Sequence, residues 1–339
     1  MTDTDLPGFL ELPLEDQRDA YLIGATELGR SASVLEKDVW VCWALEALFG
    51  CPDMPDMAFK GGTSLSKVFN AIARFSEDID VTVDHKGLAP DLDPYDSDVS
   101  RKQQGRDTAA LGELLCERSR DVVVPHLRSC LEALGHSADL LEVEKNGEEL
   151  NIRYPHAVDD RDPYYRESVK IEFGGRNMIE PNEIYVVEPY MRASFTDLTF
   201  PAGQVHVLSP MRTFWEKVTL AHADSRRPEF KNVERTSRHW YDIAVLSQHQ
   251  IGHDALLDID LLRDVIRVKN RFYYAGYAQY ELCLEGKASL LPDEAGIALL
   301  ENDYRKMVEA QMLEEPLAFD ELVTRVQSVE SAINSATGQ

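Results

Sequence analysis

The sequence lacks the features that place a protein in a membrane or in an oxidising compartment. It contains no run of 18 apolar residues, so no transmembrane helix is expected. The N-terminal residues are acidic and carry no apolar signal core. The five cysteines are scattered and form no CxxC pair, which is typical of reduced thiols. We therefore expect a cytoplasmic protein that does not contact a membrane.

Basic residues are scarce. The chain has 35 Lys and Arg against 60 Asp and Glu, for a net charge of −25. A protein that grips nucleic acid over a broad surface has the opposite balance, so any nucleic-acid contact must be local. The acidity also permits a basic protein partner, although solubility alone explains it equally simply. The sequence contains no Walker A, GxSxG or HExxH motif, which removes three common kinds of catalytic site.

The 339 residues, 44% of them hydrophobic, suffice for a sizeable core and predict two domains. Residues 1–208 form the predicted α/β domain, and residues 209–339 form a helical domain that is expected to contribute residues to a site on the first. Residues 84–106, rich in Pro, Asp and Gly, read as a loop. The predicted strands are 57–60, 78–83, 140–145, 149–155, 167–174, 183–188 and 204–207. The predicted helices are 34–49, 64–73, 107–135, 210–223 and 237–248, with a helical pattern from about 254 onward.

Two helix starts have local signals. Ser33 and Glu36 have the spacing of a capping box, in which each side chain satisfies a backbone donor of the first turn. Ser209 followed by Pro210 is a capping residue with proline at the first helical position.

The most informative segment is a glycine turn followed by two aspartates. Gly61 and Gly62 follow a short apolar strand and precede Thr63 and Ser64, where the backbone can approach an anion closely. On strand 78–83, residues 78, 80 and 82 face one side, so the carboxylates of Asp78 and Asp80 share a surface and suit a divalent ion. Taken alone, two such aspartates in so acidic a chain are better explained by a solvated turn.

Later segments add further candidate residues. Strand 167–173 places Lys170 and Glu172 on its polar face, and a third carboxylate is usual in two-metal phosphoryl transfer. An edge strand with a solvated Lys/Glu face is the alternative. Lys217 lies in helix 210–223, where it either snorkels or reaches a triphosphate. Arg238 and Asp242 lie one helical turn apart, which by itself indicates only an ion pair.

Basic residues do gather in two places, where they are candidates for contacts with a phosphate backbone or simply form solvated helix faces. The two groups are Arg226, Arg227, Lys231, Arg235 and Arg238, and Arg263, Arg267, Lys269 and Arg271.

Taken in order, these segments resemble the AbiEii-type nucleotidyltransferase toxins of the DNA polymerase β-like nucleotidyltransferase superfamily. The family's four motifs match Gly61–Thr63 with Asp78 and Asp80, then Lys170 with Glu172, then Lys217, then Arg238 with Asp242. Flanking segments 35–40, 303–307 and 319–322 are also similar, so that the likeness covers about residues 30–335.

The resemblance implies an α+β fold with a small mixed sheet flanked by helices and a C-terminal helical domain. It implies transfer of a nucleoside monophosphate from an NTP, with release of pyrophosphate, to an acceptor such as the 3′ end of tRNA. This activity blocks translation or causes abortive infection in toxin–antitoxin and phage-defence systems, so a cognate antitoxin protein is an expected partner. The implied metal is Mg²⁺ or Mn²⁺, held by Asp78, Asp80 and Glu172, with Lys217 and Asp242 also catalytic. The implied nucleotide-binding residues are Gly61, Gly62, Thr63, Ser64, Lys67, Lys170 and Arg238.

Other functions remain open from sequence. The acceptor is a protein or a small molecule in one alternative, and in another the chain is a non-catalytic NTP-binding regulator. A phosphatase of the haloacid dehalogenase type also uses two such aspartates, but it needs an apolar strand directly before the first, and residues 74–77 are not one. A glycosyltransferase with two aspartates leaves the glycine turn unexplained.

Overall fold

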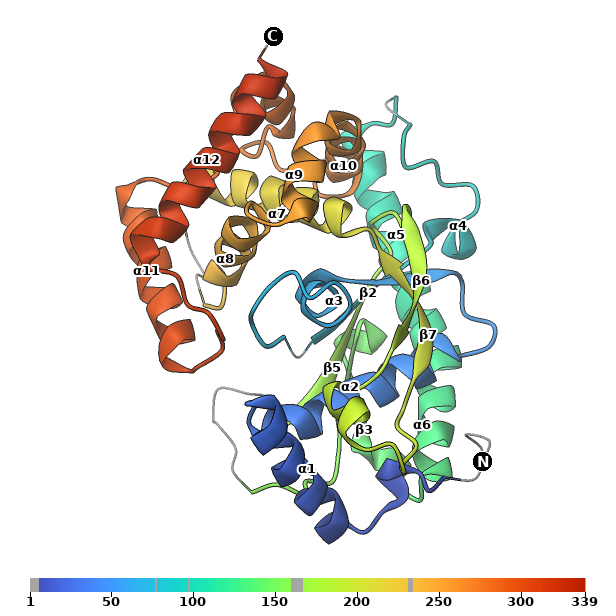
Figure 1. Ribbon diagram of the computed structural model, residues 1–339. Coiled ribbons are helices and arrows are strands. Elements are labelled where there is room, and N and C mark those ends of the chain that lie inside the picture. The colour runs from blue at the N-terminus through green and yellow to red at the C-terminus, as the bar shows by residue number, and fades with distance from the viewer. Residues whose placement is uncertain (1–5, 77, 97, 160–166, 231–233, 339) are drawn as a thin grey trace.

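The chain folds around one mixed β-sheet with helices packed against it (Figure 1). The computed structural model describes residues 6–76, 78–96, 98–159, 167–230 and 234–338. Within these ranges the strands are β1 (Met57–Lys60), β2 (Asp78–Val83), β3 (Leu141–Glu144), β4 (Glu149–Arg153), β5 (Ser168–Gly174), β6 (Asn182–Val187) and β7 (Gly203–Leu208). All seven predicted strands are present.

The strand order puts the two polar strands side by side. It runs β3-β4-β5-β2-β1-β7-β6, with β2 parallel to β5, β1 parallel to β7, and the other pairs antiparallel. Ile79 and Val81 of β2, and Val169 and Ile171 of β5, are buried on one face of the sheet. The alternate residues therefore project from the other face, as the period of two predicts.

Helices of the first part of the chain lie around this sheet (Figure 1). They are α1 (Leu14–Leu28), α2 (Ala32–Phe49), α3 (Gly61–Lys67), α4 (His85–Leu88), α5 (Arg101–Arg118) and α6 (Val124–Ala133). The predicted helix 107–135 thus starts earlier and is two helices, joined by a π-helical turn at Ser119–Val123. The segment 84–106, predicted as a loop, contains α4 and the start of α5.

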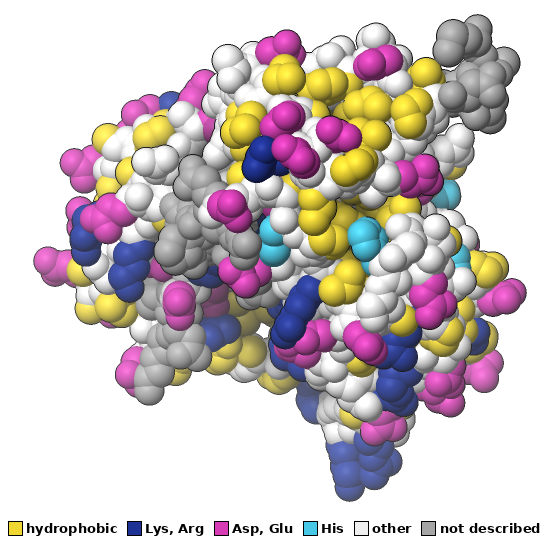
Figure 2. Space-filling model, turned by 90° about the horizontal axis from the view of Figure 1, so that it is seen from below, with side chains coloured by type: hydrophobic (Ala, Val, Ile, Leu, Met, Phe, Trp, Pro, Cys, Tyr) yellow, Lys and Arg dark blue, Asp and Glu magenta, His cyan; other side chains and the backbone are white. Residues whose placement is uncertain are grey.

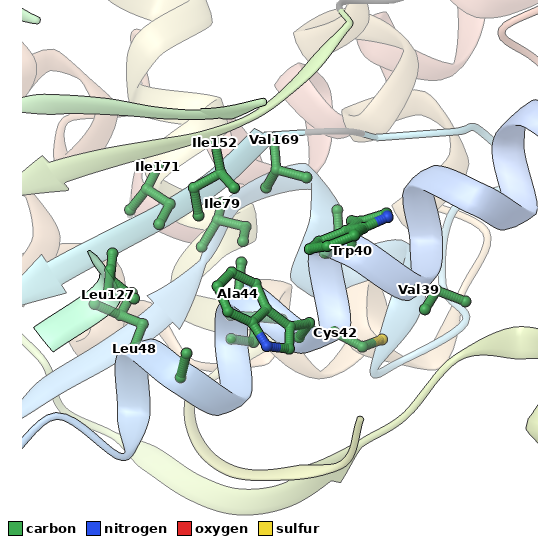
Figure 3. Packing of buried hydrophobic residues seen from close by; sticks show 14 of the residues in the cluster. Val39, Trp40, Cys42, Ala44, Leu48, Ile79, Leu127, Ile152, Val169 and Ile171 are labelled. Atoms are coloured by element: carbon green, nitrogen blue, oxygen red, sulfur yellow. The ribbon is translucent and has the colours of Figure 1, made fainter. Parts of the chain in front are cut away.

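Helix α2 supplies much of the main core. Trp40 and Ala44 lie against Ile79, Ile152 and other strand residues (Figure 3). The predicted capping box is wrong by two residues. Ser31 caps the helix by accepting a hydrogen bond from the backbone N–H of Val34 at 3.3 Å. Glu36 instead accepts bonds from the backbone N–H groups of residues 157 and 158, so a long-range contact takes the place of the local one.

The remaining described residues are helical or irregular, apart from two isolated bridges, Gly8 with Thr199 and Arg74 with Leu313. The helices are α7 (Pro210–Ser225), α8 (Ser237–Leu246), α9 (Gln250–Leu257), α10 (Ile259–Phe272), α11 (Glu294–Glu309) and α12 (Phe319–Thr337). The helix start at Pro210 is confirmed, and so is the mixed α+β class with C-terminal helices. The division into domains at residue 208 stays a prediction. The second apolar core includes Leu65 and Ile72 from α3 and the loop after it, so α3 packs on the C-terminal helices.

Among the described residues, no helix is long and apolar enough to cross a membrane. The negative charge is dispersed: on the face in Figure 2, Asp and Glu side chains are scattered among neutral and apolar ones.

Candidate active site

A cavity of about 240 Å³ lies where the polar edge of the sheet meets the C-terminal helices. The sheet contributes the end of β1, the glycine turn and β2, while α7, α8 and α10 close the other side (Figure 1). The lining residues that carry charge or belong to the turn are Lys60, Gly61, Gly62, Arg74, Asp78, Asp80, Glu216, Lys217, Arg238 and Lys269. Segments far apart in sequence thus meet at one cavity.

The two glycines make room for two charged side chains. Gly61 has φ +84°, and a Cβ there would lie 2.1 Å from Oδ2 of Asp80. A Cβ on Gly62 would lie 2.1 Å from Nη2 of Arg74. Any larger residue would therefore push a site carboxylate or guanidinium aside. The hydroxyl of Thr63 donates to the backbone oxygen of Asp78 at 2.5 Å and so ties the turn to β2.

The carboxylates of Asp78 and Asp80 face the cavity from β2. Lys60 is directly opposite Asp80 in the β1–β2 pairing, and Nη1 of Arg238 lies 3.6 Å from Oδ2 of Asp78. Burial raises the pKa of Asp80 above its usual value, and the nearby Asp78 adds to this rise while Lys60 opposes it. Two carboxylates held together in this way favour an additional cation between them.

A buried ion cluster forms one wall. Asp242 of α8 accepts bonds from Arg74 at 2.7 and 2.9 Å and pairs with Nζ of Lys217 at 2.8 Å. The side chains of Asp242, Arg74 and Lys217 are 0%, 3% and 9% exposed. Burial alone would raise the pKa of Asp242, but the two cations outweigh it and hold that pKa well below its usual range. The cluster carries one net positive charge beside the two aspartates of β2.

The opposite wall carries further cations. Lys60 pairs with Glu216 of α7 at 2.7 Å. Lys269 lies with its Nζ 4.6 Å from the centre of the Tyr273 ring, and burial lowers the pKa of Lys269 to about 8. Three lysines, Lys60, Lys217 and Lys269, therefore line the same cavity as the carboxylates, and such cations bind phosphate groups.

Lys170 and Glu172 lie beside the site but do not line its cavity. The pairing of β2 with β5 puts Asp80 opposite Glu172, as adjacent polar strands require. The side chain of Glu172 is 39% exposed and bonds to Lys170, which also pairs with Glu149 at 3.3 Å. This arrangement, called the rim cluster below, consists of Glu149, Lys170 and Glu172.

The other predicted residues fall into two groups. Gly61, Gly62, Asp78, Asp80, Lys217 and Arg238 line the cavity, and Asp242 holds two of its cations. Thr63, Ser64 and Lys67 do not line it. The hydroxyl of Ser64 donates to the backbone oxygen of Gly61 at 3.0 Å. Lys67 is buried on the far side of α3, 2.6 Å from Asp38 and over the ring of Tyr190.

Several cavity residues escaped sequence reasoning. They are Lys60, Arg74, Asn177, Glu216, His239 and Tyr273. Lys60 directly precedes the glycine turn and Arg74 precedes the aspartates by four residues, so their positions in the sequence could have suggested a place in the site. Of the two basic groups, Arg238 and Lys269 reach this cavity, whereas Arg226 bonds to the backbone of Tyr277 and Arg227 pairs with Asp224. Lys231 lies outside the described residues.

Asp78 and Asp80 fit a divalent ion that also binds the phosphates of a substrate. Mg²⁺ is usually held by one or two carboxylates, with substrate phosphates and water completing its shell. Asp78 and Asp80 supply two such carboxylates in one cavity among cations that suit phosphates. Within the described part of the chain, no three His, Cys, Asp or Glu side chains form a group that holds a metal by itself. The geometry therefore fits an ion that arrives with a nucleotide.

The comparisons with known proteins agree with this chemistry. The family model for the nucleotidyl transferase AbiEii toxin of type IV toxin–antitoxin systems matches residues 43–325. A solved structure, that of MenT4, a nucleotidyltransferase toxin from Mycobacterium tuberculosis, is similar at 17% sequence identity over 92% of this chain and 97% of that one. The TM-score of this match is 0.45. No curated protein matches the sequence.

Proposed function

The chain belongs to the AbiEii family of type IV toxin–antitoxin nucleotidyltransferases, and on this premise we propose that it transfers a nucleoside monophosphate from an NTP to the 3′ end of tRNA. The observation that carries the proposal is the single cavity in which two carboxylates of β2 meet cations from β1, α7, α8 and α10. A nucleoside triphosphate with its metal ion has the complementary charge pattern. The same cations would also contact the pyrophosphate product before it dissociates.

We assign Asp78 and Asp80 as the ligands of Mg²⁺ or Mn²⁺. The ion, when bound, neutralises charge that develops on the transferred phosphoryl group. Lys217 and Arg238 lie close enough to these aspartates to bind the triphosphate, and Lys60 and Lys269 approach it from the other wall. The acceptor hydroxyl attacks the α-phosphorus, the bond to the bridging oxygen breaks, and pyrophosphate leaves.

Asp242 acts through its partners. It holds Arg74 and Lys217 in one orientation while staying ionised, so the cavity keeps its positive wall at neutral pH. Preorganised cations of this kind need no rearrangement when charge develops. Lys170 and Glu172, which form the rim cluster with Glu149, are left out of this set because they pair with each other outside the cavity.

The acceptor is proposed from family membership and from the chemistry of the cavity. Adding nucleotides to tRNA, and so blocking translation, requires a location in the cytoplasm, where NTP and tRNA are abundant. Membership of a type IV toxin–antitoxin family implies an antitoxin as a protein partner. Phage defence by abortive infection is the biological role that follows.

The deciding experiment uses purified protein with each α-labelled NTP, Mg²⁺ and total RNA, resolved on a denaturing gel. Wild-type protein should label a tRNA-sized band and release pyrophosphate, and a chelator should abolish both. Asp80→Asn should lower turnover by about 10²–10³-fold or more because a metal carboxylate is lost. The matched control is Asp139→Asn, an exposed aspartate outside the cavity.

Three results separate the alternatives. Label on a protein band or on a small molecule would disprove the tRNA acceptor and keep the transferase. NTP binding without pyrophosphate release in a cell extract would favour a non-catalytic regulator. Turnover near the wild-type rate in Asp80→Asn would refute the metal assignment.

A further inference from the structure

A second cavity, of about 410 Å³, lies on another side of helix α10. It is formed by the segment before α5, the first turn of α5 and the end of α10. Its polar lining is Tyr95, Arg101, Gln104, Arg267, Asn270 and Arg271, with Asp96 as a carboxylate. Lys269 and Tyr273 of the same stretch line the catalytic cavity instead. One helix therefore presents cations to both cavities, and we call the second one the arginine cavity.

Arg271 is the buried member of the arginine cavity. Its side chain is 4% exposed, and its Nη2 donates to Oδ2 of Asp107 at 2.6 Å. Its Nε and Nη1 have no hydrogen-bond partner among the described residues. A buried guanidinium with donors left over is unfavourable unless an acceptor-rich group completes it. Arg271 thus favours an anion with several oxygens.

The other two arginines are held in place by aromatic rings. The guanidinium of Arg101 lies 3.5 Å from the centre of the Tyr274 ring, and Nη1 of Arg101 also donates to Gln104. The guanidinium of Arg267 lies 4.6 Å from the centre of the Tyr95 ring. Nη1 of Arg101 also donates to the backbone oxygen of Asn270 at 3.3 Å. Stacking on a ring fixes the plane of a guanidinium, whose N–H groups match a phosphate in a fork geometry. The side chains are therefore oriented before a ligand arrives.

The local charge is opposite to that of the whole chain. Three arginines line the arginine cavity against Asp96, and Asp107 is taken up by Arg271, whereas the whole molecule carries −25. Nucleic-acid contact in such a molecule has to be confined to a basic site. The arginine cavity is such a site, and it adjoins the proposed catalytic one.

We propose that the arginine cavity binds a backbone phosphate of the acceptor RNA while the 3′ end of that RNA lies in the catalytic cavity. The inference rests on the proposed function, since it names where the acceptor of that reaction is held. Binding through the phosphate backbone positions an RNA without reading its sequence.

The test compares Arg101→Gln/Arg267→Gln with a matched double variant, Arg18→Gln/Arg305→Gln. All four arginines are exposed or partly so, and Arg18 and Arg305 lie on α1 and α11, away from the arginine cavity. Fluorescence anisotropy measures the affinity for labelled tRNA at several salt concentrations, with Mg²⁺ and without NTP. Thermal melting checks that each variant is folded.

The cavity variant should bind tRNA about tenfold more weakly or worse, because charged hydrogen bonds are lost. Its slope of log K against log salt should become shallower by about 0.7, since one contact with a phosphate of a single strand is lost. Affinity for NTP should not change, and the control should bind tRNA like wild type. Equal tRNA affinity in the two double variants, or no tRNA binding by wild type, would overturn the inference.

Two further arms separate related explanations. If tRNA binding needs the arginines but wild type transfers no nucleotide, the proposed function fails and the subsite stands. If transfer occurs and the cavity variant transfers as fast as the control at subsaturating tRNA, the subsite fails alone. Inorganic phosphate at constant ionic strength should shift the melting of wild type and the cavity variant alike. A shift in wild type only, with equal tRNA affinity, would assign the arginine cavity to a small anion and contradict the RNA assignment.

Discussion

The buried ion cluster and the rim cluster both pair a predicted lysine with carboxylates, yet they differ in burial and in what they face. Asp242, with Arg74 and Lys217, is enclosed at the cavity wall with side chains at most 9% exposed. In the rim cluster Lys170 and Glu149 are each 9% exposed as well, but Glu172 is 39% exposed, so water reaches that carboxylate. Enclosure leaves charges no substitute partner, whereas water replaces a partner at the rim. We therefore expect the two clusters to differ in their contributions to stability and to catalysis.

The largest expected difference is in stability. Asp242→Asn should lower the free energy of unfolding by about 3–5 kcal/mol, because it leaves Arg74 and Lys217 buried without their counter-charge. Chemical denaturation monitored by circular dichroism measures the change. A loss below about 1 kcal/mol would make the buried cluster no different from the rim.

The buried ion cluster should also stabilise the protein less at low pH. The pKa of Asp242 is lowered on folding, so its stabilising contribution is complete above the unfolded value of about 3.9 and is lost as the pH falls toward the lower folded value. The unfolding free energy of wild type should therefore decline as the pH is lowered from 5 toward 2.5, by up to about 1.4 kcal/mol per unit from this group. Asp242→Asn should show a shallower decline over that window. Identical slopes would mean that Asp242 does not titrate abnormally.

Variants of Lys217 and Lys170 should differ in their turnover. Lys217→Met removes a cation that lines the catalytic cavity and should lower turnover by about 10²–10³-fold. Lys170→Met removes a cation that does not line it and should leave turnover nearly unchanged. Nucleotide transfer is measured below the melting temperature of each variant. Comparable losses in both would place the rim cluster within the active site.

A smaller effect concerns the room that glycine provides. Gly62→Ala should cost about 1–3 kcal/mol and reduce turnover, because its Cβ would lie 2.1 Å from Nη2 of Arg74. Gly112→Ala on α5 has no atom within 4 Å of its Cβ and should stabilise the protein by up to about 1 kcal/mol. Denaturation of both variants tests this, and equal stability would show that Arg74 shifts without cost.

The smallest effect is expected at the rim. Glu172→Gln should change the unfolding free energy by about 0–1 kcal/mol, as for other exposed ion pairs, and should leave transfer activity close to wild type. A loss of turnover beyond tenfold with unchanged stability would return Glu172 to the metal-binding set that its strand position first suggested.

The sequence predicted well what a local period determines. The alternation on β2 and β5 placed Asp78, Asp80 and Glu172 on the correct face, and Ser209 with Pro210 marked the start of α7. Alternation says which face a side chain occupies, but not whether a cavity reaches that point along the face. That is why Glu172 and Lys170 were placed in the site from sequence while the structure puts them at its rim.

Long-range partners explain the other differences. The sequence assigned no role to Arg74, whose position depends on Asp242, 168 residues further on. Lys67 looked like a phosphate ligand beside the glycine turn, but Asp38 and Tyr190 hold it on the other side of α3. No local pattern encodes such pairings, because they arise only when separate elements pack.

The separation between Arg74 and Asp242 also sets when the toxin becomes active during its own synthesis. At about 5–20 residues per second, roughly 10–30 s pass between the emergence of the first residue of this pair and that of the second. Until α8 arrives, the nascent chain has the glycine turn and both aspartates but only part of the positive wall. The ribosome therefore completes most of the polypeptide before the positive wall of the catalytic cavity is whole.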